Sequence, residues 1–299
     1  MNKGFRNVLI ASAVVLLVGF GLIVAGVVAG ASWRDVGDVI LSDKYSFGNG
    51  VHWGVGYATE AKGNKLDSEE NILKEVDAKS IEKLTINMEA GNLEIKEGKS
   101  AYFQMVNKKN RGDCYVDYNG NELTITIRGK NNNSRGARAT FWIPKGLEIA
   151  NIEVKVDAGR VTTEDINATD LTITVGAGQV KANAITAKNL SIEVDAGEFK
   201  NTGNIVADEA NLRVAAGQLK VDMLEAKHVG ASVDVGNMNI KFAGAEEDYD
   251  IDAECDLGEL KIGDKSYHIG KEYQSRVSNT DKTIKVECSV GKATIGFEK

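Results

Sequence analysis

The sequence contains few of the side chains that usually carry out catalysis. Among its 299 residues are three cysteines and three histidines. It has no Cys-x-x-Cys pair and no Cys/His spacing typical of a metal site. His52, His228 and His268 have no shared acid or nucleophile near them in the sequence. These absences argue against zinc or nucleophilic catalysis. We therefore predict no catalytic residue, no cofactor and no metal site, and a protein that is not an enzyme.

Aromatic residues are also scarce, and acidic residues outnumber basic ones. The formal net charge is −7, and aromatic residues make up 6% of the chain. No basic cluster and no alternation of basic and aromatic residues is present, which argues against nucleic-acid binding. The chain is nonetheless 42% hydrophobic, with one proline, and is long enough for a sizeable core and accessory segments.

The sequence has one long hydrophobic run, at residues 8–31, which contains no charge. As a helix it would span about 36 Å, enough to cross a bilayer. Lys3 and Arg6 precede it, so the positive-inside rule places the N-terminus in the cytoplasm. A cleaved signal peptide is the alternative, because Ala29-Gly30-Ala31 fits a cleavage site, but the run is longer than a usual signal-peptide core. We predict four segments: a cytoplasmic N-terminus (1–7), a transmembrane helix (8–31), a juxtamembrane linker (32–70) and an extracytoplasmic domain (71–299).

A repeated phrase dominates the rest of the chain. Each copy reads as an alternating strand, a small residue, a glycine and a second short strand, as in Ile152 to Thr163 and Leu171 to Ala182. A fixed period near twenty residues is typical of a solenoid. The glycines of the copies are Gly91, Gly159, Gly178, Gly197, Gly217, Gly236, Gly258 and Gly291.

Aligning the copies on the glycine separates apolar from polar columns. Apolar residues lie five and three positions before the glycine and two after it, with polar residues between them, as in a strand with one buried face. The small or apolar residue just before the glycine is also predicted to point inward. The alternation then slips by one residue, so we predict a corner at which glycine adopts positive φ. A further apolar point, as at Ile166 and Ala168, gives each coil a third side.

The fold that these columns predict is an all-β, single-stranded β-solenoid (β-helix). It has about eight coils of about 20 residues and is preceded by one N-terminal transmembrane α-helix. Residues 101–146 interrupt the repeat with strand-like runs and a hairpin turn at Tyr118-Asn119-Gly120-Asn121. We predict that this excursion caps or flanks the first coil, and that an insert at 265–281 is a hairpin or loop that covers the rod.

Two cysteines lie in an otherwise apolar column. Cys255 and Cys288 stand three positions before the glycine, where five other coils carry valine. Free thiols buried in the core and a disulfide between stacked coils both remain open.

Two charged columns are further candidates. Aspartates stand two positions before the glycine in four coils: Asp157, Asp195, Asp234 and Asp256. Turn capping accounts for them, and a calcium site at Asp234 and Asp256 is the alternative. Lysines stand three positions after the glycine in four coils: Lys181, Lys200, Lys220 and Lys261. They belong either to a solvated face or to a face that binds an anionic wall polymer.

The coil phrase, together with its lead-in Phe141-Trp142-Ile143-Pro144-Lys145-Gly146, resembles the bacterial "putative adhesin" family, a domain of unknown function. The likeness covers roughly residues 70–298. It implies a glycine-cornered β-solenoid, often behind a single membrane helix and often associated with cell-envelope stress responses. It supplies no catalytic residues to carry over.

We therefore predict a membrane-anchored, extracytoplasmic, non-catalytic protein that is a cell-surface binding, adhesin-like or envelope-stress scaffold module. The predicted partners are the membrane, through a single span, and a cell-wall polymer or envelope protein. One alternative is a carbohydrate-active β-helix enzyme that acts on cell-wall polysaccharide. The other is a solenoid that stacks end to end into filaments. The sequence leaves the ligand and the oligomeric state open.

Overall fold

The computed structural model describes residues 64–65, 78–106, 112–129, 137–268, 270–278 and 280–298. These residues belong to one compact unit, Thr59–Lys299. The predicted cytoplasmic segment 1–7, the predicted transmembrane helix 8–31 and nearly all of the linker 32–70 lie outside the described residues. Within the described part of the chain, no helix is both long and apolar enough to cross a bilayer.

The described residues form β-strands and two single-turn 3-10 helices, which confirms the all-β class. The first elements are β1 (Asn64–Lys65), η1 (Ala78–Ser80), β2 (Lys83–Met88), β3 (Gly91–Gly98), β4 (Tyr102–Val106), β5 (Asp113–Asn119), β6 (Glu122–Arg128) and β7 (Ala137–Pro144). The central elements are β8 (Glu148–Val156), β9 (Arg160–Thr163), β10 (Ile166–Val175), β11 (Gln179–Ala182), β12 (Ile185–Val194), β13 (Glu198–Asn201), β14 (Asn204–Val214), β15 (Gln218–Val233) and β16 (Asn237–Ala243). The last elements are η2 (Glu246–Asp248), β17 (Asp250–Cys255), β18 (Glu259–Ile262), β19 (Lys265–His268), β20 (Lys271–Ser275), β21 (Thr283–Cys288) and β22 (Lys292–Glu298).

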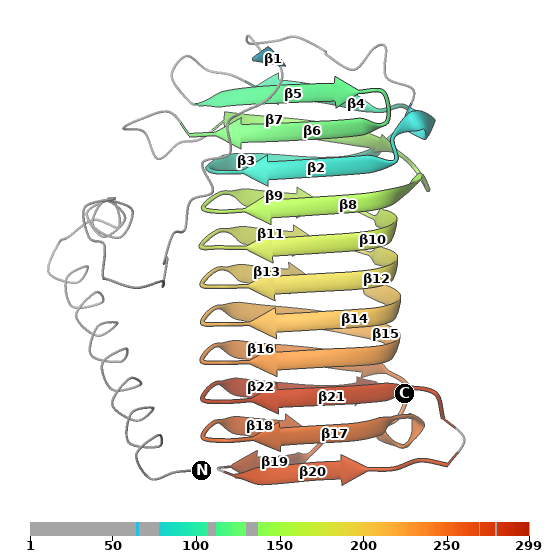
Figure 1. Cartoon of the computed structure of the whole chain (residues 1–299), viewed down its shortest axis with the longest axis vertical. Helices are drawn as coiled ribbons and strands as arrows, with labels where there is room; N and C mark the ends of the chain where they lie inside the picture. The colour runs from blue at the N-terminus through green and yellow to red at the C-terminus, as the bar shows by residue number, and fades with distance from the viewer. Residues whose placement is uncertain are drawn as a thin grey trace, which may run out of the picture. The chain divides into compact units, whose positions relative to one another are not determined.

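The strands stack into two faces of a β-solenoid-like rod (Figure 1). The long-strand face runs in the order β5, β6, β2, β8, β10, β12, β14, β15, β21, β17, β20. The short-strand face runs β4, β7, β3, β9, β11, β13, β15, β16, β22, β18, β19. The long strand β15 belongs to both faces, because its first part pairs with β13 and its second part with β14.

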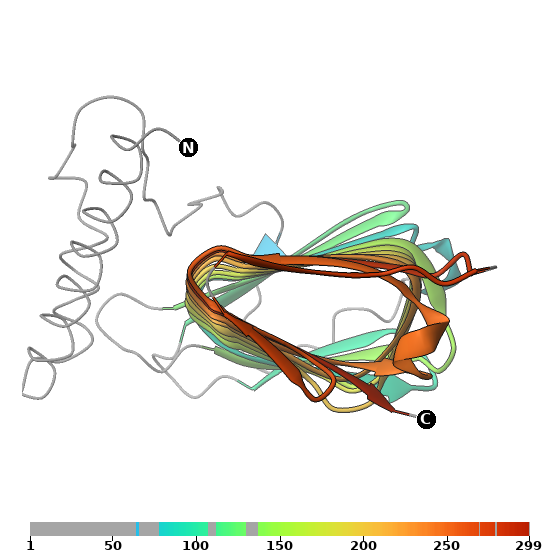
Figure 2. The ribbon, with the colours of Figure 1, turned by 90° about the horizontal axis from the view of Figure 1, so that it is seen from below.

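Identical columns pair across neighbouring coils and fill the interior. Leu171 and Ile173 of β10 lie opposite Leu190 and Ile192 of β12, and all four side chains are buried. Each buried side chain of this size stabilises the fold by roughly 1.5–3 kcal/mol. The predicted third side is also present, since Ile166 and its counterparts in later coils are buried. Figure 2 shows the resulting cross-section, in which two long sides meet at one corner and a short side lies opposite.

The corner differs from its prediction in two ways, and the first concerns the residue before the glycine. Ala158, Ala177 and Ala196 are exposed, so this column points outward and not inward. At the corner the chain has left the sheet, and the amide of Ala177 donates to the carbonyl of Asp157 in the preceding coil (2.6 Å). The strand alternation therefore ends three residues before the glycine.

The second difference concerns the reason for glycine. Of the eight corner glycines, Gly91 alone has positive φ (135°). The others are required by lack of space. A Cβ atom on Gly197 would lie 2.4 Å from the carbonyl oxygen of Gly178 and 2.7 Å from a methyl of Val175. These corners therefore pack directly on the backbone of the corner in the neighbouring layer.

The coils at the two ends of the rod do not follow chain order. The coil of β2 and β3 lies between the layer of β6 with β7 and the layer of β8 with β9. The coil of β21 and β22 lies between the layer of β15 with β16 and the layer of β17 with β18. The first and last coils are thus each inserted one layer inside the stack (Figure 1).

Antiparallel strands cover both ends of the parallel stack. β5 pairs antiparallel with β6 through the predicted hairpin at Asn119 to Asn121, and β4 pairs antiparallel with β7. At the other end, β20 and β19 pair antiparallel with β17 and β18. The side chains of Tyr267 and Tyr273 pack there with ring centroids 5.3 Å apart. Strands from both interrupting segments therefore cover the edges of the parallel stack.

Candidate functional site

A groove runs along the glycine corner over several coils. Its volume is about 1100 Å³. The floor consists of the small corner residues, because alanine and glycine leave no side chain to fill the space. The wall consists of the residues that follow the glycines: Asn92, Arg160, Gln179, Glu198, Gln218 and Asn237, with Arg138 beside Asn92. Amide and guanidinium groups therefore dominate this wall.

The wall residues belong to the short-strand face, and the next outward column of that face carries lysines. Lys181, Lys200 and Lys220 lie opposite one another on three successive strands, β11, β13 and β15. The predicted fourth lysine, Lys261, is separated from them by Asn239 and Thr294. Like charges directly opposite one another on neighbouring strands are destabilising, so this row costs stability.

Few acids compensate the lysine row. Lys220 pairs with Asp222 at 2.8 Å. The neighbouring Glu198 accepts a hydrogen bond from Gln179 at 2.5 Å. Within the described part of the chain, Lys181 and Lys200 take part in no ion pair.

Large apolar side chains are exposed at one end of the glycine corner. In the column just before the glycine, alanine gives way to Val235, Val290 and Leu257, which are 52%, 43% and 55% exposed. These three residues lie on consecutive layers, because Gly291 packs on Gly236 and Gly258 packs on Gly291. The corner thus continues from a small-residue groove into an apolar ridge.

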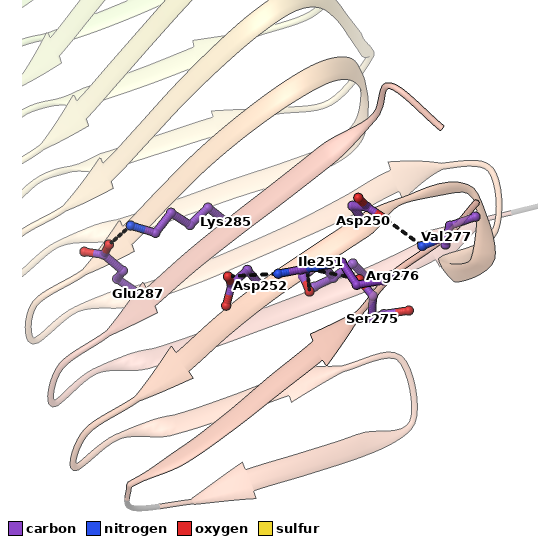
Figure 3. A network of polar contacts seen from close by, with 8 residues as sticks. All are labelled: Asp250, Ile251, Asp252, Ser275, Arg276, Val277, Lys285 and Glu287. Atoms are coloured by element: carbon purple, nitrogen blue, oxygen red, sulfur yellow. Dashed lines mark hydrogen bonds and ion pairs between the residues drawn. The ribbon is translucent and has the colours of Figure 1, made fainter. Parts of the chain in front are cut away.

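The long-strand face carries paired charges. Arg213 lies 3.8 Å from Glu193 and 3.3 Å from Asp234. Lys285 pairs with Glu287 at 2.6 Å, as Figure 3 shows. Each of these outward acids therefore has a basic partner within the sheet.

A second polar network holds the cap against the rod (Figure 3). Arg276 donates to the carbonyl of Ile251 at 3.1 Å and to the carboxylate of Asp252 at 3.3 Å. The amide of Val277 donates to Asp250 at 2.6 Å. These hydrogen bonds connect β17 to the segment that follows β20.

The two column cysteines are neighbours, as the alignment predicted. Cys255 of β17 lies opposite Cys288 of β21, and both are buried free thiols. Burial and the nearby Cys255 raise the pKa of Cys288 to about 12. At neutral pH the protonated form is therefore strongly favoured, and a buried thiol of this kind is a poor nucleophile.

The histidines and aspartates considered as site residues do not come together in one place. His228 contacts Thr283 of the adjacent strand at 3.1 Å, and His52 lies outside the described residues. Asp234 and Asp256 are not on adjacent layers, because the coil of Ser289 lies between them. The two carboxylates are therefore not the neighbours that the predicted calcium site required. The described residues contain no group of three metal-ligating side chains. Burial, followed by repulsion from Glu89, raises the pKa of Asp157.

The sequence did not indicate one buried polar group. Asn201 occupies the inward column four after the glycine, where other coils carry residues such as Val221 and Ile240. Its Nδ2 donates to the carbonyl of Asn183, and its Oδ1 has no partner within the described residues.

This fold, with its stacked glycine corners, defines a β-solenoid-like repeat protein. The chain belongs to the Toastrack DUF4097 family, whose model matches residues 81–287. The resemblance predicted from the coil phrase is confirmed: this is an adhesin-like domain of the kind named "putative adhesin". A search of curated proteins found no match.

Several solved structures are similar to the chain. A putative adhesin from Bacteroides fragilis is 15% identical, with a TM-score of 0.42 over 78% of this chain and 95% of that one. A putative cell adhesion protein from Clostridium sporogenes is 14% identical, with a TM-score of 0.29 over 79% and 100%. A putative lipid binding protein from Parabacteroides distasonis is 16% identical, with a TM-score of 0.35 over 79% and 96%. Similarity at this level does not identify a ligand.

Proposed function

We propose that the protein is a membrane-anchored, extracytoplasmic binding module of the cell envelope that holds its ligand without transforming it. The observation that carries this proposal is the groove of about 1100 Å³ beside the lysine row. It offers amide and cationic groups repeated at the strand spacing of about 4.8 Å. Such a surface suits an extended ligand better than a small substrate. An adhesin-like or envelope-stress scaffold role fits the same geometry.

The proposed topology rests on the uncharged run at 8–31 and on the cations Lys3 and Arg6 before it. Protease treatment of intact cells should remove everything after residue 31, while a cytoplasmic marker protein stays intact. Complete protection of the 32–299 portion would contradict the topology.

The binding role can be separated from the enzymatic alternative in one assay. The full chain, purified in detergent, is incubated with isolated wall and membrane fractions. We expect the chain to sediment with a fraction and to release no soluble carbohydrate. Release of saccharide would support an enzyme that acts on wall polysaccharide. Failure to sediment with either fraction would contradict the binding role.

The filament alternative meets a specific obstacle in the fold. It called for an uncapped apolar final coil, and here the last coil lies inside the stack while β19 and β20 cover the end. Exposed polar residues such as Glu272 and Gln274 lie on β20, which is how edge strands discourage pairing. Electron microscopy of the purified chain is expected to show no filaments.

A further inference from the structure

The row Lys181–Lys200–Lys220 departs from the charge pattern of the rest of the rod. Several lysines elsewhere in the described residues pair with a nearby acid, as Lys96 does with Glu94 and Lys285 with Glu287. Described lysines without an ion pair, such as Lys83 and Lys261, lie opposite residues other than lysine on the neighbouring strands. In the row, Lys220 alone has such a partner. Three cations therefore face each other across successive strands of a protein whose net charge is −7.

The shape of the row limits what it can bind. Its charges are spaced along the rod axis at about 4.8 Å, the separation of neighbouring strands. A linear polymer with regularly spaced anions can contact several of them at once, whereas a single small anion would contact only one or two. The adjacent groove continues the surface with Arg160 and the amides of Gln179 and Gln218, while its one acid in this region, Glu198, is bound to Gln179.

The side chains around the row narrow the class of polymer. The outward positions of β9, β11, β13 and the start of β15 carry no aromatic residue, so no platform for nucleic-acid bases is present. The large apolar side chains that are exposed, such as Val235, lie on the corner or elsewhere and not on these strands, so this face has nothing to insert into a bilayer. Lysine binds phosphate as a point charge, which suits a flexible chain of phosphate groups that is not held in one bidentate geometry.

We propose that the row Lys181–Lys200–Lys220, with the groove beside it, binds a linear phosphodiester polymer that carries no bases. This proposal deepens the envelope-binding function proposed above and rests on it. The row supplies the cations, the amides of the groove wall supply hydrogen bonds, and the alanine and glycine floor lets the polymer approach the backbone.

The test uses the full chain in detergent and poly(glycerol phosphate) as the probe, with binding measured over a range of salt concentrations. The triple variant K181Q/K200Q/K220Q removes the row and keeps side-chain length. The matched control K155Q/K227Q/K285Q removes the same three charges from ion pairs elsewhere on the rod. Circular dichroism and the melting temperature check that both variants fold.

We expect the row variant to bind about tenfold to hundredfold more weakly at low salt, and the control variant to bind within about twofold of the parent. The slope of log K against log salt should fall by about 2 for the row variant, because about 0.7 counterions are released per phosphate contact on a single strand. Equal losses in the two variants, or no loss in the row variant, would overturn the proposal.

Other probes distinguish other ligands. Binding of a single-stranded oligonucleotide, of polygalacturonate or of phosphatidylglycerol vesicles as tight as that of poly(glycerol phosphate) would overturn the choice of polymer. If the chain sediments with wall material but does not bind poly(glycerol phosphate), this inference fails and the envelope-binding function stands. If it sediments with neither envelope fraction, the proposed function itself fails.

Discussion

The backbone of each glycine corner lies against the corner of the coil before it. This contact leaves no room for a side chain, so a single methyl group is expected to push neighbouring coils apart. Gly197→Ala would place Cβ 2.4 Å from a backbone oxygen, which no side-chain rotation relieves. We expect the free energy of unfolding to fall by about 1–3 kcal/mol, measured by urea denaturation.

The control for this substitution is Gly296→Ala in β22. A Cβ there would lie 3.5 Å from Lys241 Cγ, an ordinary contact, and the residue does not have positive φ. We expect no loss of stability, and a gain of up to about 1 kcal/mol from reduced freedom of the unfolded chain. Similar effects of the two substitutions would show that corner packing is not what requires glycine.

The buried thiol of Cys114 is expected to make the stability of the fold depend on pH. Burial, with a smaller contribution from Asp113, raises the pKa of this thiol from 9.0 to about 12. The fold therefore favours the neutral thiol. The thiol's contribution to the free energy of unfolding is complete below about pH 9 and is lost as the pH rises toward 12. At pH 11 the loss is about 2–3 kcal/mol.

This prediction is measured as the difference between the parent chain and Cys114→Val in urea unfolding from pH 8 to pH 11. Tyrosines also titrate at high pH, but they do so in both proteins and cancel. The parent should lose stability relative to the variant as the pH rises. A constant difference across this range would contradict the assigned burial.

The last coil is the element on which the C-terminal end of the rod depends. β21 and β22 lie between the β15–β16 layer and the β17–β18 layer. Deleting residues 280–299 would therefore remove an internal layer, whereas loss of an outermost repeat from a solenoid leaves its neighbours paired. We expect hydrogen exchange to become fast throughout 250–275, although those residues are retained. Continued protection of β17 and β18 would mean that they pack elsewhere.

For the strands, the sequence predicts which residues are buried better than it predicts the order in which the coils stack. The alternation around each glycine predicted the buried strands, and the turn at Tyr118 to Asn121 predicted the β5–β6 hairpin. The insertion of the first and last coils was not predictable, because similar apolar columns pair equally well with any neighbour. The layer of β6 and β7 was also missed as a coil, because β6 ends at Arg128 and β7 begins at Ala137, a longer separation than the glycine phrase predicts.

The candidate site was predicted only in part, for physical reasons at the corner. The lysine column followed directly from strand alternation. The outward direction of Ala177 and of Val235 did not, because alternation no longer applies once the chain leaves the sheet. The small residues of the groove floor face outward because of that turn, so column alignment could not reveal the groove. The separation of Asp234 from Asp256 likewise depended on the unpredicted order of coils.

At the scale of the whole molecule, the rod is a repetitive scaffold that presents polar groups at fixed spacing. Among the described residues the buried side chains are apolar apart from Thr126, Thr163 and Asn201, and the described thiols are buried. The corner groove and the lysine row are surface features that follow from repetition. The role that we propose for them is retention of an extended envelope polymer without chemical conversion of it.

The measurement that tests this claim most directly combines binding and turnover in one sample. The full chain is mixed with isolated cell wall, and the bound protein and the soluble carbohydrate and phosphate are quantified over time. We predict that the chain stays with the wall, that salt releases it, and that no soluble product accumulates. Accumulation of product, or absence of the chain from the wall pellet at low salt, would contradict the account.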